Sequence, residues 1–302
     1  MTTGYARYLA AKRTVDDRAL NRHVLSHVRA ALPPEELRIV EVGGGTGTMV
    51  ARLVDWGVVE RGSYTLVDVD DELLEHGRLA LLEWSAKRGL PTTASRDGVR
   101  IGSLDVRFVR RELHDYLQAG STGGADLLIA NALLDVVDVP RTLPGLLNLL
   151  GTAGTYWFTV TYDGECSFQP EHPLDEPVLT AYHDDMDHRV RHGRPAGERR
   201  AGRHLLPRLR EAGAPVRWAG ASDWVVFPDA DGAYPHDERY FLACILGTIE
   251  EALTGRVDAE VLTTWLGARR RQLSAGELVY VAHQLDVAGR APRGVGHALA
   301  RE

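Results

Sequence analysis

The sequence predicts an α/β protein built on a doubly wound, mostly parallel sheet of seven strands. Short apolar runs alternate along the chain with segments whose apolar residues recur at the helical period. The first of these runs ends in a glycine-rich turn that opens directly into a helix. Because strands that alternate with helices are joined by right-handed crossovers, the helices should cover both faces of the sheet.

Composition is that of an ordinary globular protein. The 302 residues are 44% hydrophobic and 25% charged, which is enough apolar material for a substantial core. No apolar run approaches the roughly 18 residues of a membrane span, and the polar N-terminus lacks the apolar core of a secretion signal. These features favour a cytoplasmic location without membrane contact. The net charge of −7 argues against a protein that mainly neutralises nucleic-acid phosphates.

The N-terminal segment, residues 1–36, is expected to be helical. Apolar residues follow the helical period over 5–32, and the Thr-Val-Asp sequence at 14–16 is typical of a cap and restart. Two consecutive prolines, Pro33 and Pro34, end the segment because proline cannot continue a helix.

The main domain is expected over residues 37–290. Its first strand, 37–42, leads through the glycine turn into a helix. The run at 125–131 is continuously apolar, as expected for a parallel strand covered on both faces. The stretch 90–102 is rich in Pro, Thr, Ser, Asp and Gly, which is typical of a connecting loop. The other strands expected in this half lie at 63–70, 104–109 and 155–161, with helices at 71–89 and about 140–150.

The regular alternation breaks after residue 162. We expect an irregular polar insertion at about 163–200, a helical one at about 229–273 and a flexible tail at 291–302. The remaining expected elements are a short helix within the first insertion, a helix near 202–212, a strand within 215–227, helices at about 237–254 and 258–272, and a last strand within 277–285.

The glycine turn suggests a nucleotide-like ligand. Glu41 ends the first strand and is followed by Gly43, Gly45 and Gly47, which let the backbone approach a ligand closely at a helix N-terminus. Such a turn alone fits a nicotinamide or flavin equally well. Asp68, 21 residues beyond Gly47 at the end of the second strand, can accept hydrogen bonds from both hydroxyls of a ribose. The alternative for Asp68 is an exposed acid at a strand end.

The sequence IVEVGGGTGTM, followed by YTLVDVDDELLEHGR, resembles motifs I and II of class I S-adenosylmethionine-dependent methyltransferases. This resemblance implies the Rossmann-like methyltransferase fold with S-adenosylmethionine as cofactor. It assigns cofactor binding to Glu41, to the three glycines and to the Asp68-Val69 pair. In unbroken order it covers about 38–162, and it extends more loosely over 202–228 and 276–286.

Two further segments carry the same resemblance. FVRREL is similar to the segment after the third strand, and it implies that Glu112, with Leu113, reads the adenine amino group. ANALLDVVDVP is similar to the segment after the fourth strand and implies that Asn131 lies near the methionine part of the cofactor. A nicotinamide dehydrogenase would need neither Glu41 nor Glu112.

Candidate acceptor residues follow from the same fold. The carboxyl edge of the sheet, where ligands bind, is reached by Asp135 after the fourth strand and Tyr162 after the fifth, and we expect both to be catalytic. The family implies a lid at residues 1–36, with Tyr8, Lys12 and Arg13 facing the substrate. The alternatives are a helix-capping role for Asp135, a half-buried aromatic at 162 and a solvated helix face at 8–13.

The insertions offer weaker candidates. His183 and Asp187 stand four apart on an expected helix, but a polar surface helix is favoured and we expect no metal site. With only two cysteines, the chain lacks a thiolate zinc pattern as well. Asp223 is a candidate for the rim of the substrate site, its alternative being a turn beside a buried Trp224. The arginine-rich stretch 189–204 could receive an anionic acceptor, although arginine supplies nearly all basic residues of this chain.

Methyl transfer to an oxygen, nitrogen or carbon atom of a small molecule is the function that the resemblance implies, and the basic residues add an anionic acceptor as a candidate. One alternative is a methyltransferase that acts on RNA or protein, and another is a cofactor-binding homologue without catalysis. A macromolecular acceptor predicts a basic stripe, stacking aromatics or an added binding module, and none stands out. We expect no nucleic-acid or membrane partner, and the oligomeric state is left open.

Overall fold

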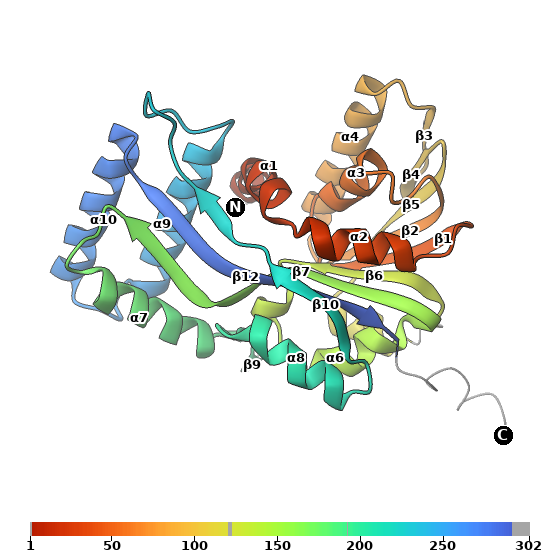
Figure 1. Ribbon diagram of the computed structural model, residues 1–302. Helices are drawn as coiled ribbons and strands as arrows, with labels where there is room; N and C mark the ends of the chain where they lie inside the picture. Colours follow the sequence, from red (N-terminus) through yellow and green to blue (C-terminus); the bar gives the residue numbers. More distant parts are fainter. Residues whose placement is uncertain (1, 120–122, 192, 292–302) are drawn as a thin grey trace.

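The computed structural model of the protein describes residues 2–119, 123–191 and 193–291 (Figure 1). The strands are β1 (Leu37–Val42), β2 (Arg61–Asp68), β3 (Thr92–Ala94), β4 (Gly98–Ile101), β5 (Ser103–Arg110), β6 (Ala125–Asn131), β7 (Leu150–Gln169), β8 (Val190–Arg191), β9 (Arg194–Pro195), β10 (Val216–Ala221), β11 (Trp224–Val226) and β12 (Val279–Arg290). The helices are α1 (Thr2–Ala19), α2 (Arg22–Ala31), α3 (Thr48–Asp55), α4 (Asp71–Lys87), α5 (Leu113–Gln118), the 3-10 turn η1 (Leu134–Val136), α6 (Val139–Asn148), α7 (Asp175–Asp187), α8 (Ala201–Glu211), α9 (Glu238–Leu253) and α10 (Ala259–Ala275).

The central sheet confirms the predicted α/β class. The seven strands that the sequence predicts lie across the sheet in the order β10-β12-β7-β6-β1-β2-β5. Among the described residues, β3, β4 and β11 extend this sheet to ten strands. Strands β1, β2, β5, β6 and β7 pair in parallel, whereas β12 runs antiparallel to both β7 and β10. From β1 the chain first adds β2 and β5 on one side of the sheet. It then adds β6 and β7 on the other side of β1. This reversal beside β1 opens a crevice at the carboxyl ends of β1 and β6.

Helices cover both faces of the sheet (Figure 1). The side chains of β1 alternate between two cores: Ile39 packs with α2, α3 and α4 on one face, and Val42 packs with α6 and α8 on the other. Both side chains are fully buried. Burial on two faces is the reason that β1 and β6 are apolar at successive positions rather than alternating.

The N-terminal helical segment breaks later than predicted. Helix α1 continues through 14–16 and ends at Ala19. Thr14 does not cap a helix because its hydroxyl donates to Glu238 on α9 at 2.8 Å. Asn21 caps instead, its side chain accepting the backbone N–H of Val24 at 3.0 Å.

The prediction of a connecting loop at 90–102 was wrong. This segment contains a hairpin of β3 and β4, and β4 pairs with β5. The segment is polar in composition, so the sequence did not reveal the alternation of buried and exposed residues in β4. In that strand, Val99 and Ile101 are buried. Gly98 is required there because a Cβ atom would lie 2.1 Å from the carbonyl oxygen of Val106.

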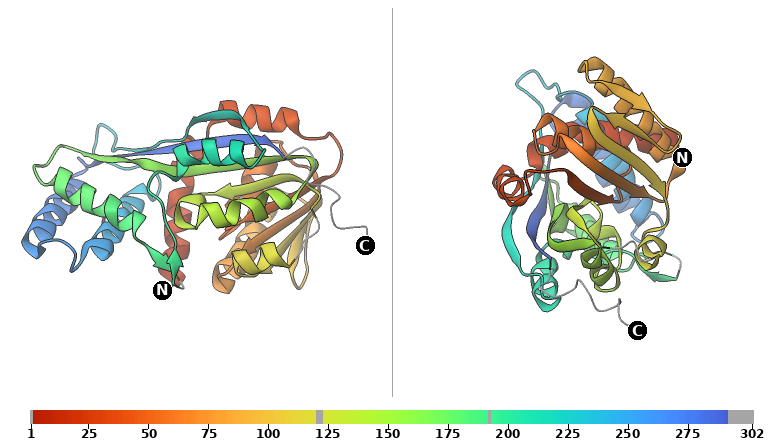
Figure 2. Two further views of the ribbon diagram at one scale, coloured as in Figure 1. Left: turned by 90° about the horizontal axis from the view of Figure 1, so that it is seen from below. Right: turned by 90° about the vertical axis from the view of Figure 1, so that its right-hand side faces the viewer.

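The two insertions form a helical extension around one long ribbon. Strand β7 continues eight residues beyond the predicted end at 161, and β12 pairs with it antiparallel to Gln169. Figures 1 and 2 show this ribbon extending past the other strands, with α7, α9 and α10 gathered near its far end. Phe168 of β7 packs edge-on against Trp265 of α10 at 5.4 Å between ring centroids. Of the predicted tail, residues 292–302 lie outside the described part of the chain.

Within the described ranges, no helix has both the length and the apolar character needed to cross a membrane.

Candidate active site

The glycine turn after β1 requires glycine for a backbone reason. Gly43, Gly45 and Gly47 have φ of 65°, 50° and 68°, in the left-handed region that other residues rarely adopt. Gly47 is also the N-cap of α3. The alternating glycines therefore fold the chain back on itself so that the turn faces the end of β2, where Gly43 donates to the carbonyl of Val67 at 2.8 Å.

Asp68 joins the turn to the end of β2. Its Oδ2 accepts the backbone N–H of Gly45 at 2.8 Å and its Oδ1 accepts that of Asp70 at 3.0 Å. A carboxylate has about four acceptor positions, so two remain for external donors. Two vicinal hydroxyls, as on a ribose, match this remaining capacity.

Glu41 is buried beneath the turn, with 1% of its surface exposed. Burial raises its pKa from 4.5 to about 8, while the Tyr64 hydroxyl, which donates to its Oε2 at 2.7 Å, and the nearby Arg52 lower it. The side chain is therefore mostly neutral at pH 7, and it closes the floor of the site as a hydrogen-bonding group rather than as a free charge.

One cavity of about 1140 Å³ runs along the carboxyl edge of the sheet. Predicted cofactor residues that line it are Glu41, Gly43, Gly45, Asp68, Val69, Glu112, Leu113 and Asn131. Predicted acceptor residues that line it are Tyr8, Lys12, Asp135 and Tyr162. We call the part lined by the glycine turn, the ends of β2 and β5, and α5 the cofactor half. The part lined by α1, η1, α7, β11, α9, and the far portions of β7 and β12 is the acceptor half.

At one end of the cofactor half, the side chain of Val69 is 63% exposed although it is apolar. Glu112 follows the end of β5 and is the N-cap of α5, where its side chain accepts the backbone N–H of Asp115 at 3.1 Å. One carboxylate oxygen is used in that cap, so the other is the one that can meet an adenine amino group. An exposed apolar face beside an acceptor suits a planar base.

Two strained residues mark the junction of the two halves. Ala132 after β6 and Val160 within β7 have φ of 51° and 53°, which is unfavourable for a β-branched residue such as valine. Asp286 of β12, fully buried, holds this bulge by accepting the N–H of Val160 at 2.8 Å. Beside it, Asn131 accepts the hydroxyl of Thr159 at 2.8 Å. The strain thus lies where the cofactor half meets the acceptor half.

Asp135, on η1, faces the acceptor half. Its Oδ1 atom is buried and accepts no hydrogen bond from any residue in the described ranges. Burial raises its pKa from 3.8 to about 6, although a hydrogen bond with its own backbone and the charges of Lys12 and Arg189 oppose this. A carboxylate with this pKa is ionised at pH 7 and can accept a proton from a bound acceptor.

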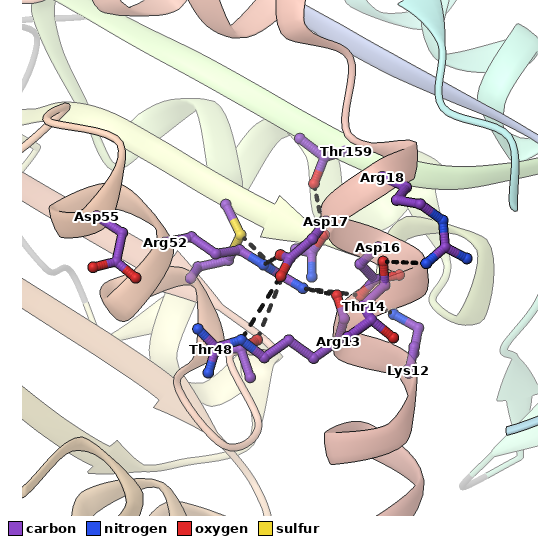
Figure 3. A network of polar contacts seen from close by, with 12 residues as sticks. Lys12, Arg13, Thr14, Asp16, Asp17, Arg18, Thr48, Arg52, Asp55 and Thr159 are labelled. Carbon is purple, nitrogen blue, oxygen red and sulfur yellow. Dashed lines mark hydrogen bonds and ion pairs between the residues drawn. The ribbon is translucent and has the colours of Figure 1, made fainter. Parts of the chain in front are cut away.

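Helix α1 is held over the acceptor half by buried charges. Lys12, with 7% of its side chain exposed, bonds Asp16 at 2.8 Å, and Asp16 also accepts the indole N–H of Trp224 at 2.9 Å. Figure 3 shows the Arg52 guanidinium reaching from α3 to α1, where its Nε bonds Asp17 at 2.5 Å. The ammonium of the chain's one cavity-lining lysine is therefore already paired with a carboxylate.

Three predicted substrate residues lie outside the lining of this cavity. Arg13 follows Lys12 on the helix and so points to another side, where it pairs with Asp17 at 3.9 Å. His183 lies behind Tyr162, whose hydroxyl is 2.7 Å from its Nε2. Asp223 pairs with His283 at 2.8 Å rather than facing the cavity.

Three arginines of the arginine-rich stretch, Arg189, Arg199 and Arg203, pair with neighbouring acids. Arg199 bonds Asp184 and Asp187 of α7, each at 3.1 Å, and Arg203 bonds Asp163 at 3.0 Å. These pairs account for the acidic sequence of α7. Of Arg189, Arg199 and Arg203, Arg189 is the one that lines the cavity.

Several lining residues were missed from the sequence, among them Tyr182, Tyr280 and Gln284. A signal for the last two was present, since alternate residues of a strand share a face. Positions 280, 282, 284 and 286 of β12 form its buried face, and two of them are polar. A polar residue on an otherwise buried strand face is a reason to suspect a site.

No protein-family model matches the chain, and neither does any curated protein. Among solved structures, a candidate Type II methyltransferase from Anaeromyxobacter dehalogenans is similar, with TM-score 0.51 and 17% identity over 90% of this chain and 97% of that one. An S-adenosylmethionine-dependent methyltransferase from Thiobacillus denitrificans, solved with S-adenosyl-L-homocysteine, gives TM-score 0.46 and 16% identity over 90% and 92%. A candidate methyltransferase solved in complex with the Haloferax volcanii Trm112 activator gives TM-score 0.46 and 16% identity over 95% and 96%. The likeness to the Anaeromyxobacter dehalogenans structure shows that this chain shares the fold of that candidate methyltransferase.

Proposed function

We propose that the protein transfers a methyl group from S-adenosylmethionine to a small-molecule acceptor. The observation that carries the proposal is the single cavity in which the glycine turn and Asp68 open onto a second half lined by aromatic residues and by Asp135. Such a two-part cavity suits two ligands that meet at its junction, because methyl transfer needs the acceptor atom in line with the methyl group.

The residues of the cofactor half fit the adenosyl group. Asp68 has acceptor capacity left for the ribose hydroxyls after its two backbone hydrogen bonds. The exposed side chain of Val69 offers an apolar surface for the adenine ring. Glu112 would accept the adenine amino group, and Asn131 lies at the junction, where the methionine part would extend.

The chemistry asked of the chain is modest. When bound, the cofactor supplies an activated methyl group, so the protein mainly has to orient the acceptor and exclude water. Helix α1, fixed by its buried ion pairs, covers the acceptor half and limits access of water. Asp135 would hold the proton released by an acceptor that arrives protonated, and Tyr162, on the opposite wall, would orient that acceptor.

A macromolecular acceptor is the weaker candidate. Its reactive group would have to pass beneath α1 into a half whose walls include the buried residues Tyr162, Trp224 and Tyr280. Small molecules enter such sites more readily.

Calorimetric titration and thermal unfolding test the cofactor assignment. S-adenosylmethionine and S-adenosylhomocysteine should each bind and raise the melting temperature, because they bind the folded state only. Asp68→Ala should abolish most of this shift. Asp105→Ala, an exposed aspartate at the opposite edge of the sheet, is the matched control and should leave it intact. A melting-temperature rise with NADH and none with either S-adenosyl compound would refute the proposal.

A further inference from the structure

Two acceptor atoms are buried in the acceptor half without a partner. Gln284 is 2% exposed, lines the cavity, and its Oε1 receives no hydrogen bond from the described residues. Oδ1 of Asp135, which lines the same half, is likewise buried and accepts no hydrogen bond from the described residues. A buried acceptor without a donor is unfavourable, so both atoms indicate a ligand that brings hydrogen-bond donors.

The charges of the acceptor half disfavour an anion. Lys12 and Arg189 are the basic residues in the described lining of this half, and each is paired with a carboxylate. Lys12 bonds Asp16 at 2.8 Å, and Arg189 bonds Asp185 at 3.0 Å. No ion pair within 4 Å joins Asp135 to a described basic residue, so its carboxylate is available to a ligand.

The walls of the same half are aromatic. Tyr8, Tyr162, Tyr182, Trp224 and Tyr280 line it from five different elements. Aromatic faces attract cations because of their quadrupole, and they also pack against flat apolar rings. A carboxylate set among such faces is a favourable environment for an ammonium group.

We propose that the acceptor is an amine with an aromatic or similarly apolar body, and that Gln284 orients it by accepting one of its N–H groups while Asp135 accepts another. This inference rests on the proposed function, which it narrows to N-methylation. Nitrogen is favoured over oxygen because an amine brings two or more N–H groups, one for each of the two buried oxygens, whereas an alcohol brings a single O–H group. A carbon acceptor would leave both buried oxygens without donors.

The transfer then balances in two steps. An ammonium ion bound beside Asp135 gives one proton to the carboxylate, which leaves a neutral amine and a protonated Asp135. The nitrogen lone pair forms the new N–C bond to the methyl carbon as the C–S bond breaks, and its electron pair stays on sulfur. The products are the N-methylated ammonium ion and S-adenosylhomocysteine, and Asp135 returns its proton to solvent.

Matched probes test the proposal by binding rather than by turnover. Benzylamine, phenethylamine and tryptamine are each titrated calorimetrically into the full chain saturated with S-adenosylhomocysteine, beside the corresponding alcohols and carboxylates. At least one amine should bind about tenfold tighter than both of its counterparts, the scale of a hydrogen bond to a charged group. No preference for the amine in any of the three sets, including absence of binding, would overturn the inference.

Variants separate ligand recognition from a structural role. Gln284→Met should weaken amine binding about tenfold without lowering the melting temperature, because it removes an unpaired buried polar group. Gln169→Met, an exposed glutamine at the end of β7, is the control and should change neither. Asp135→Asn should remove the preference for amine over alcohol. A lower melting temperature for Gln284→Met with unchanged amine affinity would assign Gln284 to folding instead.

Cofactor binding keeps the two proposals distinguishable. If S-adenosylhomocysteine binds and the amines show no preference, only the acceptor class is wrong. If S-adenosylhomocysteine itself does not bind, the proposed methyl transfer is wrong.

Discussion

The cofactor half and the acceptor half of the cavity are held together by different interactions. In the cofactor half, carboxylates bond to backbone N–H groups: Asp68 accepts from Gly45, and Glu112 accepts from Asp115 three residues away. In the acceptor half, charged side chains pair with one another, as Lys12 does with Asp16. The first kind of site depends on local chain geometry, and the second depends on how helices and strands pack. We therefore expect loss of the ion pairs that hold α1 over the acceptor half to affect folding most, and loss of the backbone hydrogen bonds of the cofactor half to affect binding most.

The largest expected effect concerns Arg52, which anchors α1 over the acceptor half. Arg52→Met should lower the free energy of unfolding by about 3 kcal/mol, because it removes the buried guanidinium that bonds Asp17 and lies 3.6 Å from Asp16, which keeps Lys12 as a partner. Urea unfolding measures the change. Arg88→Met, which removes an exposed pair with Asp55, should cost less than about 1 kcal/mol. Equal losses in the two variants would contradict the anchoring role.

An effect no larger than that of Arg52→Met concerns the dependence of stability on pH. Burial raises the pKa of Glu41 from 4.5 to about 8, and those of Asp135 and Asp286 from 3.8 to about 6. At a pH between the ordinary pKa of each group and its raised pKa in the folded state, the folded chain binds more protons than the unfolded chain. The free energy of unfolding therefore falls as the pH rises. The contribution of these groups is fully present below about pH 4. It is lost as the pH rises through 6 for the two aspartates and through 8 for Glu41.

Glu41→Gln isolates the cofactor-half part of this dependence. At about 1.4 kcal/mol per pH unit, the Glu41 contribution should fall by about 3 kcal/mol between pH 5 and pH 8. The glutamine variant should therefore match the parent near pH 5 and exceed its stability at pH 8, as followed by urea unfolding at both pH values. Glu36→Gln, at an exposed glutamate before β1, should behave like the parent. A parent stability that rises from pH 5 to 8 would contradict the assignment.

The smallest expected effect lies at the junction of the halves. Thr159→Val keeps the side-chain shape but removes the hydroxyl that donates to Asn131 at 2.8 Å. Because the amide of Asn131 is then no longer fixed, affinity for S-adenosylhomocysteine should fall by about 1 kcal/mol, as measured calorimetrically. Binding of the amine probes should change less. Thr263→Val on the exposed face of α10 serves as the control; a loss of amine binding that exceeds the cofactor loss would place Thr159 in the acceptor half instead.

The glycine turn was predictable because its physics is local. Positive φ at Gly43, Gly45 and Gly47 can be anticipated from residue type, and the spacing to Asp68 follows from one strand–helix–strand unit. The apolar runs likewise predicted where the parallel strands lie along the chain. The hairpin at 92–101 was not predicted because its polar residues outnumber the few that are buried.

By itself, the sequence determined the α/β class, the strand order along the chain and the cofactor half, because each depends on residues close together in the chain. Only the tertiary structure decided the acceptor half. Tyr8 and Gln284 meet there from opposite ends of the chain, and Lys12 loses its availability to a substrate because the packing of α1 buries it beside Asp16. Residue type gives the charge of a side chain, but only packing decides whether that charge meets a ligand or a neighbour.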